Sequence, residues 1–393
     1  MRGTVDFDVA VVGGGIHGAG VAQAAAAAGY SVVLLEQTAL AAGTSSRSSK
    51  LVHGGLRYLE TADFALVHGS LREREILLRI APDLVRRQQF FIPVYRDSSR
   101  SRWWIAAGLA LYALLVGPKR ADARFHVVPR SGWGELDGLS TDGLKGVFRY
   151  TDAQTDDAAL TRAVMRSAEE LGATLLCPAR VHAGRLLEDG VELEYEDAGE
   201  HQRLMARVVV NAAGPWSARL AACFDPSLPM VPVENVQGAH LELPGRIERG
   251  CYYLEVPEDR RAVFVMPWRG DRTLLGTTEN PYQGDPAKVT VLDKEKHYLL
   301  AAYHRYFPRR SDEILDAWAG LRVLPAGHER TFGRSRETQL PVDRPGRPRA
   351  VSILGGKLTA YRATGDKVMD ILKPSLPQRK RKADTRTLTL GKA

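Results

Sequence analysis

The sequence contains few cysteines and no motif that would join them. Its three cysteines, Cys177, Cys223 and Cys251, are widely spaced in a chain of 393 residues, and no CxxC pair occurs. An odd, scattered set suggests neither a disulfide framework nor a zinc site, and it favours a reducing, cytoplasmic setting. The acidic residues Asp6 and Asp8 lead directly into apolar sequence, so no signal peptide is predicted.

The sequence also lacks the roughly 20 consecutive apolar residues that a membrane-spanning helix requires. The nearest candidate, WWIAAGLALYALLVG at residues 103–117, is too short to span and is flanked by Arg102 and by Lys119 and Arg120. Two interpretations remain open. The stretch is either a buried helix or a helix lying in a membrane surface, with tryptophans at the headgroups and basic flanks against anionic lipid.

The charge balance is basic, at +8 with a pI near 9.4. This balance favours an anionic partner, whether a phosphorylated small molecule, an anionic lipid surface or nucleic acid. The tail PSLPQRKRKADTR at residues 374–386 is expected to be solvated or to contact lipid. Because it lacks interleaved aromatic residues, nucleic-acid binding is not predicted.

The first part of the chain has the pattern of a dinucleotide-binding unit. An apolar strand is expected at residues 7–12, an alanine-rich helix ends at Gly29, and a second strand follows at residues 31–35. The turn between the first strand and the helix carries a GxGxxG motif formed by Gly13, Gly15 and Gly18. In this motif the glycines permit a tight turn, close approach to a pyrophosphate, and close helix–strand packing.

Two further features, an acidic residue and a hydroxyl-rich loop, bear on which dinucleotide is bound. Glu36 ends the second strand and is placed to accept hydrogen bonds from a ribose, which disfavours NADP. The motif itself does not separate FAD from NAD. The loop that follows is rich in hydroxyl groups and is either a flexible linker or a segment that passes close to a pyrophosphate. Its hydroxyl residues include Thr44, Ser45, Ser46 and Ser49.

Strand-to-glycine junctions recur after residues 206–211 and again at Gly355 and Gly356, which predicts a nucleotide domain built from separated segments. Short strand-like runs between residues 231 and 277 predict an antiparallel sheet in a second domain. The expected fold class is therefore α/β: a Rossmann-like dinucleotide-binding domain built from separated segments plus a second, α+β domain with an antiparallel sheet. The proposed limits are 1–75, 145–225 and 315–393 for the first domain, and 76–144 and 226–314 for the second.

The stretch KLVHGGLRYLE at residues 50–60 combines a titratable ring, a flexible backbone and a fixed cation. His53, Gly54, Gly55, Arg57 and Tyr58 lie within six residues. This combination suits a small anionic substrate that comes very close to a flat ring. The alternative is an ordinary glycine-rich loop.

With these motifs in view, the chain resembles the FAD-dependent glycerol-3-phosphate dehydrogenases of the glycine-oxidase-like and D-amino-acid-oxidase-like flavoproteins. The resemblance extends from Asp8 to about Arg362, and its most specific blocks are VVGGGIHGAG, TSSRSSKLVHGGLRYLE, NAAGPW, FVMPW, LLGTTE and GGKLTAYR. It implies that the first domain is a Rossmann-like FAD-binding domain and the second a substrate (cap) domain. It also implies oxidation of sn-glycerol 3-phosphate to dihydroxyacetone phosphate at the inner face of a membrane. Electrons pass to quinone in this family, or to oxygen in oxidase relatives. The family's C-terminal helical domain has no expected counterpart here, and a homodimer is allowed.

The resemblance also implies roles for individual residues. The expected catalytic residues are His53, Arg57, Arg322 and Lys357, and the expected substrate-binding residues are Tyr58, Thr277, Arg336 and His240. The expected FAD-binding residues are Gly13, Gly15, Gly18, Glu36, Thr44, Ser45, Ser46, Ser49, Leu51, Gly54, Gly55, Val181, Ala213, Gly214, Trp216, Gly355, Gly356, Leu358 and Thr359.

The chemistry of the reaction independently supports the cations and the histidine. The planar fork of arginine binds a phosphate monoester better than lysine does, and a neutral histidine, with an ordinary pKa of about 6.5, can accept a hydroxyl proton. Each role has a structural alternative. Arg322 can pair with Asp316 or Glu313, His240 can be a satisfied interior histidine, and Arg336 and Lys357 can be surface or structural residues.

Two rival functions also fit the sequence. One is a sibling FAD oxidoreductase that acts on another 2-hydroxy acid or an amine, for which a single arginine suffices to bind a carboxylate. The other is a membrane flavoprotein without catalytic activity. The intact HGGLR and GGKLT blocks favour an enzyme over the inactive protein.

Overall fold

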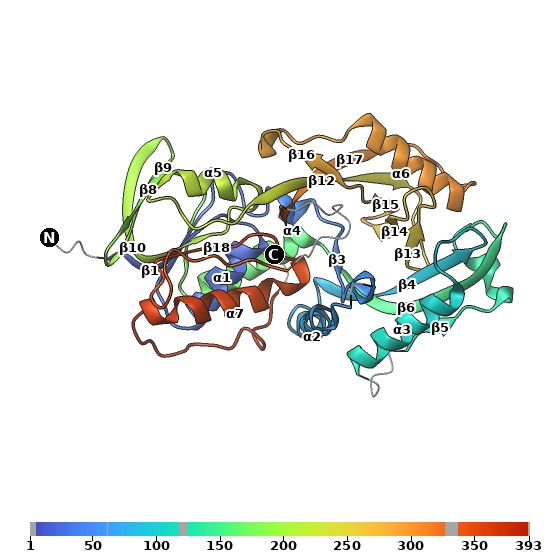
Figure 1. The fold of residues 1–393 in the computed structure, drawn as a ribbon, viewed down its shortest axis with the longest axis horizontal. Coiled ribbons are helices and arrows are strands. Elements are labelled where there is room, and N and C mark those ends of the chain that lie inside the picture. Colours follow the sequence, from blue (N-terminus) through green and yellow to red (C-terminus); the bar gives the residue numbers. More distant parts are fainter. Residues whose placement is uncertain (1–4, 61, 118–123, 327–336, 392–393) are drawn as a thin grey trace.

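Two β-sheets organise the chain, which is described here from a computed structural model covering residues 5–60, 62–117, 124–326 and 337–391. Figure 1 shows the first sheet in the left half of the molecule and the second in the right half. Each sheet has its own hydrophobic core, so the expected mixed α/β fold with an FAD-type domain and a sheet-containing cap domain is confirmed.

The first sheet is mixed, and the strands that precede and follow the dinucleotide motif pair in parallel. Among the described residues its order is β11-β8-β9-β10-β1-β2-β7, and β18 pairs with β10. The strands are β1 (Phe7–Val12), β2 (Val32–Leu35), β7 (Thr174–Leu176), β8 (Ala179–Leu187), β9 (Gly190–Asp197), β10 (Glu200–Asn211), β11 (Phe224–Asp225) and β18 (Ala350–Ser352).

Helices α1, α4 and α7 pack with this sheet, and α1 also packs against both α4 and α7. α1 (Ile16–Ala27) is alanine-rich and almost wholly buried, because small side chains let neighbouring helices approach from several directions. α4 (Asp157–Glu170) begins at the cap residue Asp156, whose carboxylate accepts the Ala159 amide hydrogen. Helix α7 comprises Tyr361–Leu372, and a short helix, α5 (Ser217–Ala222), also belongs to this half.

The second sheet is mainly antiparallel, with one parallel pair between β4 and β13. Its order among the described residues is β16-β12-β15-β14-β13-β4-β6-β3, with β17 on β12 and β5 on β6. The strands are β3 (Leu51–Val52), β4 (Val85–Tyr95), β5 (His126–Val127), β6 (Leu144–Thr155), β12 (Val233–Pro244), β13 (Cys251–Glu255), β14 (Ala262–Trp268), β15 (Arg272–Gly276), β16 (Asn280–Tyr282) and β17 (Asp316–Pro325). Its helices are α2 (Phe64–Ile80), α3 (Arg102–Val116) and α6 (Asp293–Tyr306).

The strand pairing differs from the proposed division at three strands. β3, β6 and β17 belong to the second sheet, although residues 51–52, 145–155 and 316–325 had been assigned to the FAD-binding unit. Pairing partners far away in the sequence decide this membership, and local hydrophobic pattern does not reveal them. The exact domain limits stay a prediction.

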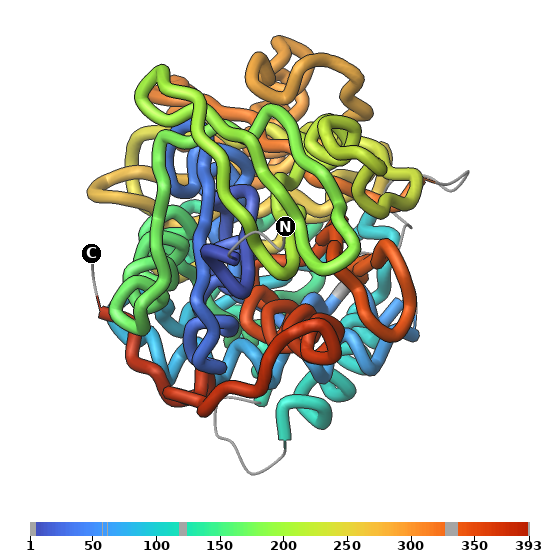
Figure 2. The backbone as a smooth tube through the Cα atoms, turned by 90° about the vertical axis from the view of Figure 1, so that its left-hand side faces the viewer, coloured from blue at the N-terminus to red at the C-terminus, as the bar shows by residue number. Residues whose placement is uncertain are grey.

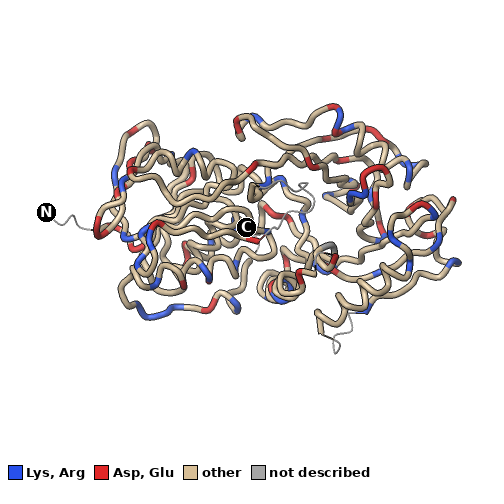
Figure 3. The backbone as a smooth tube through the Cα atoms, in the orientation of Figure 1, with Lys and Arg blue, Asp and Glu red and all other residues tan. Residues whose placement is uncertain are grey.

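Helix α3 is the apolar stretch for which a buried helix and a surface helix were both considered. Only its residues Leu109 and Tyr112 are buried, whereas Trp103 and Trp104 are 72% and 61% exposed. The buried-helix interpretation was therefore wrong for one face. Figure 3 shows α3, at the lower right, with little charge along its length. No described helix combines the length and apolar character needed to cross a membrane.

The basic tail packs against the first half of the molecule instead of extending into solvent. Lys382 donates its amide hydrogen to the Ala27 carbonyl at 2.8 Å, and Leu390, which is 1% exposed, donates to Ile80 at 2.6 Å. Figures 2 and 3 show this segment along the lower edge, with its basic residues together. Backbone hydrogen bonds hold the segment at both places, whereas the side chains of residues 378–382 are exposed, as in a solvated basic tail. A contact of this tail with lipid stays a prediction.

Candidate active site

A cavity of about 840 Å³ lies where the glycine junctions of the first sheet face the second sheet. Its walls come from segments that are far apart in the sequence. They are the turn after β1, the end of β2, the loop of residues 42–49, the first residues of β8, the residues after β10, the second half of β17 and residues 355–359. The three strand-to-glycine junctions, which are far apart in the sequence, therefore all border this cavity.

The glycine turn leaves no room for side chains where backbone must approach closely. Gly13 has a positive φ of 116°, and a Cβ atom there would lie 2.5 Å from the Ala212 carbonyl oxygen. A Cβ on Gly18 would lie 1.9 Å from the Gly13 oxygen. Gly15 caps α1 without a side chain, and the first turn of this helix carries no acidic residue. A helix N-terminus that its own cap residue does not block, together with the bare turn, suits a pyrophosphate.

Glu36 borders the same cavity, and its carboxylate is already oriented. Its Oε2 accepts the Gly14 amide hydrogen at 2.7 Å, and its Oε1 accepts the Thr38 amide hydrogen at 2.9 Å. Because each carboxylate oxygen has two lone pairs, acceptor capacity remains for ribose hydroxyls. The position of Glu36 therefore fits the sugar of a dinucleotide.

A buried polar atom also points to a ligand in this cavity. His17 borders it, and the ring nitrogen Nδ1 is buried with no hydrogen-bond partner among the described residues. Burial lowers the pKa of His17 to about 4, so the ring is neutral at pH 7. Together with the bare turn and Glu36, this atom makes the residues present a good fit for FAD.

Most of the predicted cofactor residues border this cavity. Those that do are Gly13, Gly15, Glu36, Thr44, Ser45, Ser49, Leu51, Val181, Ala213, Gly214, Trp216, Gly355, Gly356, Leu358 and Thr359. Gly55 borders a smaller cavity next to it, whereas Gly18, Ser46 and Gly54 border neither. The cofactor role of each residue stays a prediction.

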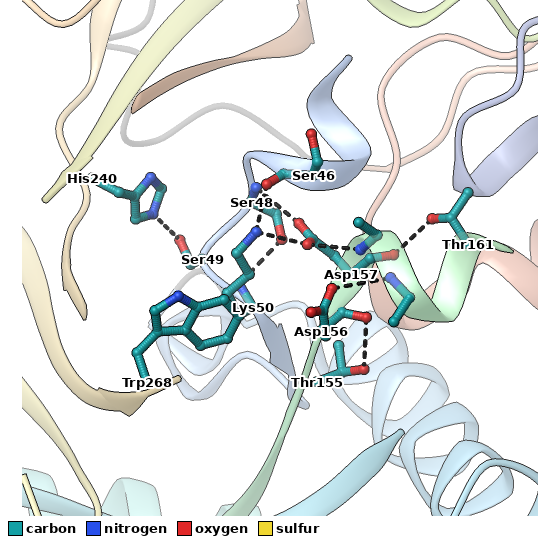
Figure 4. Close-up of polar contacts among 12 residues, drawn as sticks. Ser46, Ser48, Ser49, Lys50, Thr155, Asp156, Asp157, Thr161, His240 and Trp268 are labelled. Carbon is teal, nitrogen blue, oxygen red and sulfur yellow. Dashed lines mark hydrogen bonds and ion pairs between the residues drawn. The ribbon is translucent and has the colours of Figure 1, made fainter. Parts of the chain in front are cut away.

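The hydroxyl-rich loop is fixed in place and is not a flexible linker. Thr44 donates its hydroxyl hydrogen to the Leu321 carbonyl at 2.6 Å, and Ser45 accepts the Ile16 amide hydrogen at 2.9 Å. The hydroxyl of Ser49 lies 3.1 Å from Nε2 of His240 (Figure 4). These bonds tie the loop to β17, to the start of α1 and to β12.

A buried ion pair that the sequence analysis did not identify also holds this loop. The Lys50 ammonium lies 2.7 Å from the Asp157 carboxylate and donates to the Ser46 carbonyl at 2.5 Å. The other Asp157 oxygen accepts the Ser48 amide hydrogen at 3.0 Å (Figure 4). Since the two residues are 107 positions apart, no local pattern could have paired them.

The smaller cavity, of about 130 Å³, shares part of its wall with the larger one. The residues that border both are Ser49, Leu51, His53, Tyr58 and Arg322. Two of the predicted catalytic residues and one predicted substrate residue therefore lie at the boundary between the cavities. Thr277 borders the smaller cavity alone, and Lys357 borders the larger one.

Arg322 is held toward this boundary by two described bonds. Its guanidinium donates to Glu279 Oε1 at 2.9 Å and to the Thr277 hydroxyl at 3.1 Å. The arginine side chain is 22% exposed and the Glu279 side chain only 6%. The acidic neighbour of Arg322 is thus Glu279, whereas the sequence interpretation had considered Asp316 and Glu313.

Lys357 and His53 approach the boundary from the other side. The Lys357 ammonium lies 3.6 Å from the centre of the Tyr58 ring, and the His53 amide donates to the Thr359 hydroxyl at 3.1 Å. Arg57 lies in the short helix η2 (Leu56–Leu59), and its side chain is outside the described set. Arg336 lies outside the described residues, so its predicted role is not placed.

His240 is a neutral buried histidine at the edge of the larger cavity. Burial lowers its pKa well below the usual value, and the nearby cations Arg322 and Lys50 lower it further. Its ring stacks on Trp318 with 5.8 Å between centroids. Nε2 has Ser49 as a partner, and Nδ1 is buried with none among the described residues. His240 is therefore only half satisfied by the protein.

Several residues of the smaller cavity were not identified from the sequence, among them Tyr253, Arg261 and Glu279. Arg261 donates to the Glu279 carbonyl at 3.1 Å. Glu279 had a usable signal, since it ends the LLGTTE block. Arg261 had none, because it follows the charged, exposed residues Glu258, Asp259 and Arg260, from which the sequence does not distinguish it.

The chain matches the family model described as FAD dependent oxidoreductase over residues 8–362. It is 38% identical over 377 residues to the D-erythritol 1-phosphate dehydrogenase of Brucella abortus, covering 94% of this chain and 74% of that protein. It is also 38% identical over 376 residues to the glycerol-3-phosphate dehydrogenase of Pseudomonas aeruginosa, covering 94% and 72%. Among solved structures, the glycerol-3-phosphate dehydrogenase of Bacillus halodurans complexed with FAD aligns with a TM-score of 0.75 and 27% identity, covering 98% of this chain and 67% of that one.

The family match covers most of the chain, and its relatives include several glycerol-3-phosphate dehydrogenases. The larger cavity independently fits a flavin dinucleotide. The chain therefore belongs to the FAD-dependent oxidoreductases, as an enzyme that uses FAD and is similar to glycerol-3-phosphate dehydrogenases.

Proposed function

We propose that the chain oxidises the C2 hydroxyl of sn-glycerol 3-phosphate and releases dihydroxyacetone phosphate. The observation that carries this proposal is the small cavity beside the cofactor cavity, with His53, Tyr58 and Arg322 in the shared wall. A second cation, Arg261, borders the small cavity as well. A phosphate monoester has close to two negative charges and needs more than one cation, whereas a carboxylate needs only one.

In this proposal Arg322 and Arg261 bind the phosphate and set the orientation of the substrate. The Thr277 hydroxyl and the Glu279 carboxylate hold the Arg322 fork, so the guanidinium loses little side-chain entropy on binding. Glu279 also offsets part of the positive charge of Arg322, which is why Arg261 is needed as a second cation for the phosphate. The phosphate end thus fixes C2 near the boundary between the cavities.

His53 accepts the hydroxyl proton when the C2 hydroxyl becomes a carbonyl. Bound FAD supplies the acceptor for the hydride that leaves C2, so the two electrons and the proton are accounted for. Lys357 supports the step electrostatically, since its ammonium lies on the Tyr58 ring at the cofactor side of the boundary. A His53→Asn variant is expected to lose most turnover and keep its FAD.

A second substrate is favoured by one specific observation, the 38% identity to a D-erythritol 1-phosphate dehydrogenase. Erythritol 1-phosphate presents the same phosphate and a longer polyol, so both substrates would use the same cations. The size of the polyol end of the small cavity decides between them. The experiment below therefore tests both sn-glycerol 3-phosphate and D-erythritol 1-phosphate.

We further propose that quinone accepts the electrons at the cytoplasmic face of a membrane. Helix α3 supports this proposal, because its outer face presents Trp103 and Trp104 to the surroundings. Tryptophan is enriched where proteins meet lipid headgroups. Arg102 at the start of the helix adds a cation for anionic lipid.

The deciding experiment is an anaerobic absorbance scan of the FAD-loaded protein. Bleaching of the oxidised flavin band by sn-glycerol 3-phosphate supports the proposal, and bleaching only by D-erythritol 1-phosphate supports the second candidate. Bleaching only by lactate, 2-hydroxyglutarate or glycine would refute a phosphate substrate. In the Arg322→Lys variant the phosphate substrate is expected to bleach at a much higher concentration, because one bidentate partner is lost. A flavin that none of these reduces would favour the protein without catalytic activity.

A further inference from the structure

A buried chain of hydrogen bonds leads from helix α3 to the backbone of the HGG loop. The Gly54 amide donates to the Tyr112 hydroxyl at 3.0 Å, and Tyr112 donates to Asp152 Oδ2 at 2.7 Å. The other Asp152 oxygen accepts from Arg74 at 2.9 Å. Tyr112, Asp152 and Arg74 are 2%, 1% and 1% exposed, so water does not compete for these bonds. Three elements, α2, α3 and β6, thus support one loop amide.

The direction of each bond in this chain is determined by the groups themselves. Burial and the nearby Asp152 raise the pKa of Tyr112 well above its usual value, so the hydroxyl keeps its single hydrogen. Because that hydrogen is donated to the carboxylate, a lone pair remains for the Gly54 amide. Arg74 carries the countercharge and also donates to the Thr151 carbonyl at 3.2 Å. The tyrosine therefore acts as a fixed acceptor toward the loop.

The loop is held from the opposite side by a second bond to its backbone. The His53 amide donates to the Thr359 hydroxyl at 3.1 Å, whereas the next amide, Gly54, points to Tyr112. No side chain fits at position 54, since a Cβ atom would lie 2.5 Å from both the Tyr112 oxygen and Leu71 Cδ2. Two consecutive peptide groups are thus fixed between η8 (Leu358–Ala360) and α3, and the His53 side chain projects from them.

We propose that Tyr112 is a positioning residue, which orients His53 at the boundary between the cavities by holding the Gly54 amide. Tyr112 borders neither described cavity, so it acts through the loop and not on a ligand. The inference about turnover rests on the proposed function, whereas the inference about the loop does not.

The test compares Tyr112→Phe with a matched control that loses the same kind of bond elsewhere. Tyr252 is fully buried and donates its hydroxyl to Asp137 at 2.7 Å, and it borders neither cavity. Tyr112→Phe is expected to lower Tm more than Tyr252→Phe, because it removes two bonds in a fully buried network whereas the control removes one bond to a partly exposed carboxylate. Only Tyr112→Phe is expected to speed hydrogen exchange in peptides that contain Gly54, and to lower the rate of flavin reduction about tenfold with a smaller change in KM. FAD content is expected to stay at the wild-type level.

Unchanged exchange at Gly54 in Tyr112→Phe would overturn the inference. So would an unchanged reduction rate together with faster exchange, because the loop would then move without affecting His53. The reduction rate is measured with whichever tested substrate bleaches the wild-type flavin. If sn-glycerol 3-phosphate fails in the wild type, only the substrate proposal falls, and the exchange comparison still decides the role of Tyr112.

Discussion

The buried ion pair between Lys50 and Asp157 gives a prediction about stability whose size can be worked out. The two side chains are 4% and 0% exposed, and their charged atoms are 2.7 Å apart (Figure 4). Burial raises the pKa of the Asp157 carboxyl even though Lys50 acts to lower it. Desolvation therefore outweighs the attraction, and the pair stabilises the fold little compared with apolar side chains. Removing one partner alone should lower the stability of the fold considerably, because the remaining charge stays buried without its counterion.

An Asp157→Asn variant keeps the shape and an acceptor oxygen but leaves the Lys50 ammonium without its carboxylate. Removing one partner of a buried pair costs roughly 3–5 kcal/mol. The lower end applies here, since Lys50 keeps its bond to the Ser46 carbonyl. At about 2.1 cal/mol/K per residue, unfolding of 393 residues has an entropy near 0.8 kcal/mol/K. We therefore expect Tm to fall by about 4 °C.

Scanning calorimetry of the FAD-loaded protein measures this change. The double variant Lys50→Met with Asp157→Asn is expected to recover most of the loss, because no buried charge remains. The control is Asp293→Asn, which breaks an exposed pair to Lys296 whose side chains are 84% and 36% exposed. This control is expected to leave Tm unchanged within error. Equal shifts for Asp157→Asn and Asp293→Asn, or no recovery in the double variant, would refute the reasoning.

Three further outcomes are expected. Gly18→Ala should abolish FAD retention, measured by the flavin absorbance of purified protein, because its Cβ would lie 1.9 Å from the Gly13 oxygen; normal retention would contradict the packing argument. The folded-state pKa of His17 is lowered to about 4, so the unfolded chain binds this proton more tightly. Stability is then full above pH 6.5 and falls as the pH drops toward 4, by up to about 3 kcal/mol; urea unfolding should show a slope that His17→Asn removes. Replacing Trp103 and Trp104 with Ser should release the protein from anionic vesicles in a flotation assay, and unchanged flotation would exclude α3 as the contact.

The strands that the sequence predicted best are buried apolar runs bounded by turn residues. Residues 7–12 were expected as a strand and form β1 with those limits, and the strand-like runs expected between residues 231 and 277 form β12 to β15. Such runs are recognisable because a short stretch of sequence contains both the apolar residues of the strand and the turn residues that bound it. The sheet to which a strand belongs is not fixed locally. This is why the pairing of β3, β6 and β17 with the second sheet could not be predicted from the sequence.

The same distinction separates the predicted and the missed residues of the site. Gly13, Glu36 and His53 lie in short motifs whose spacing carries a chemical reason, and all three border a cavity. Asp157 and Arg261 have no such motif. Each reaches the site through strand pairing or helix placement decided by distant residues, so their contribution could not be read from the sequence.

The loop from Thr44 to Gly55 explains why the two halves must act together. Toward the first sheet, its Ser45 hydroxyl accepts from the start of α1, and Lys50 pairs with the start of α4. Toward the second sheet, Thr44 donates to β17 and the Gly54 amide donates to Tyr112 on α3. A segment bonded to both sheets cannot follow one without straining its bonds to the other. Because this loop also contributes Ser49, Leu51 and His53 to the wall that the two cavities share, a relative movement of the sheets would change the boundary between the cavities.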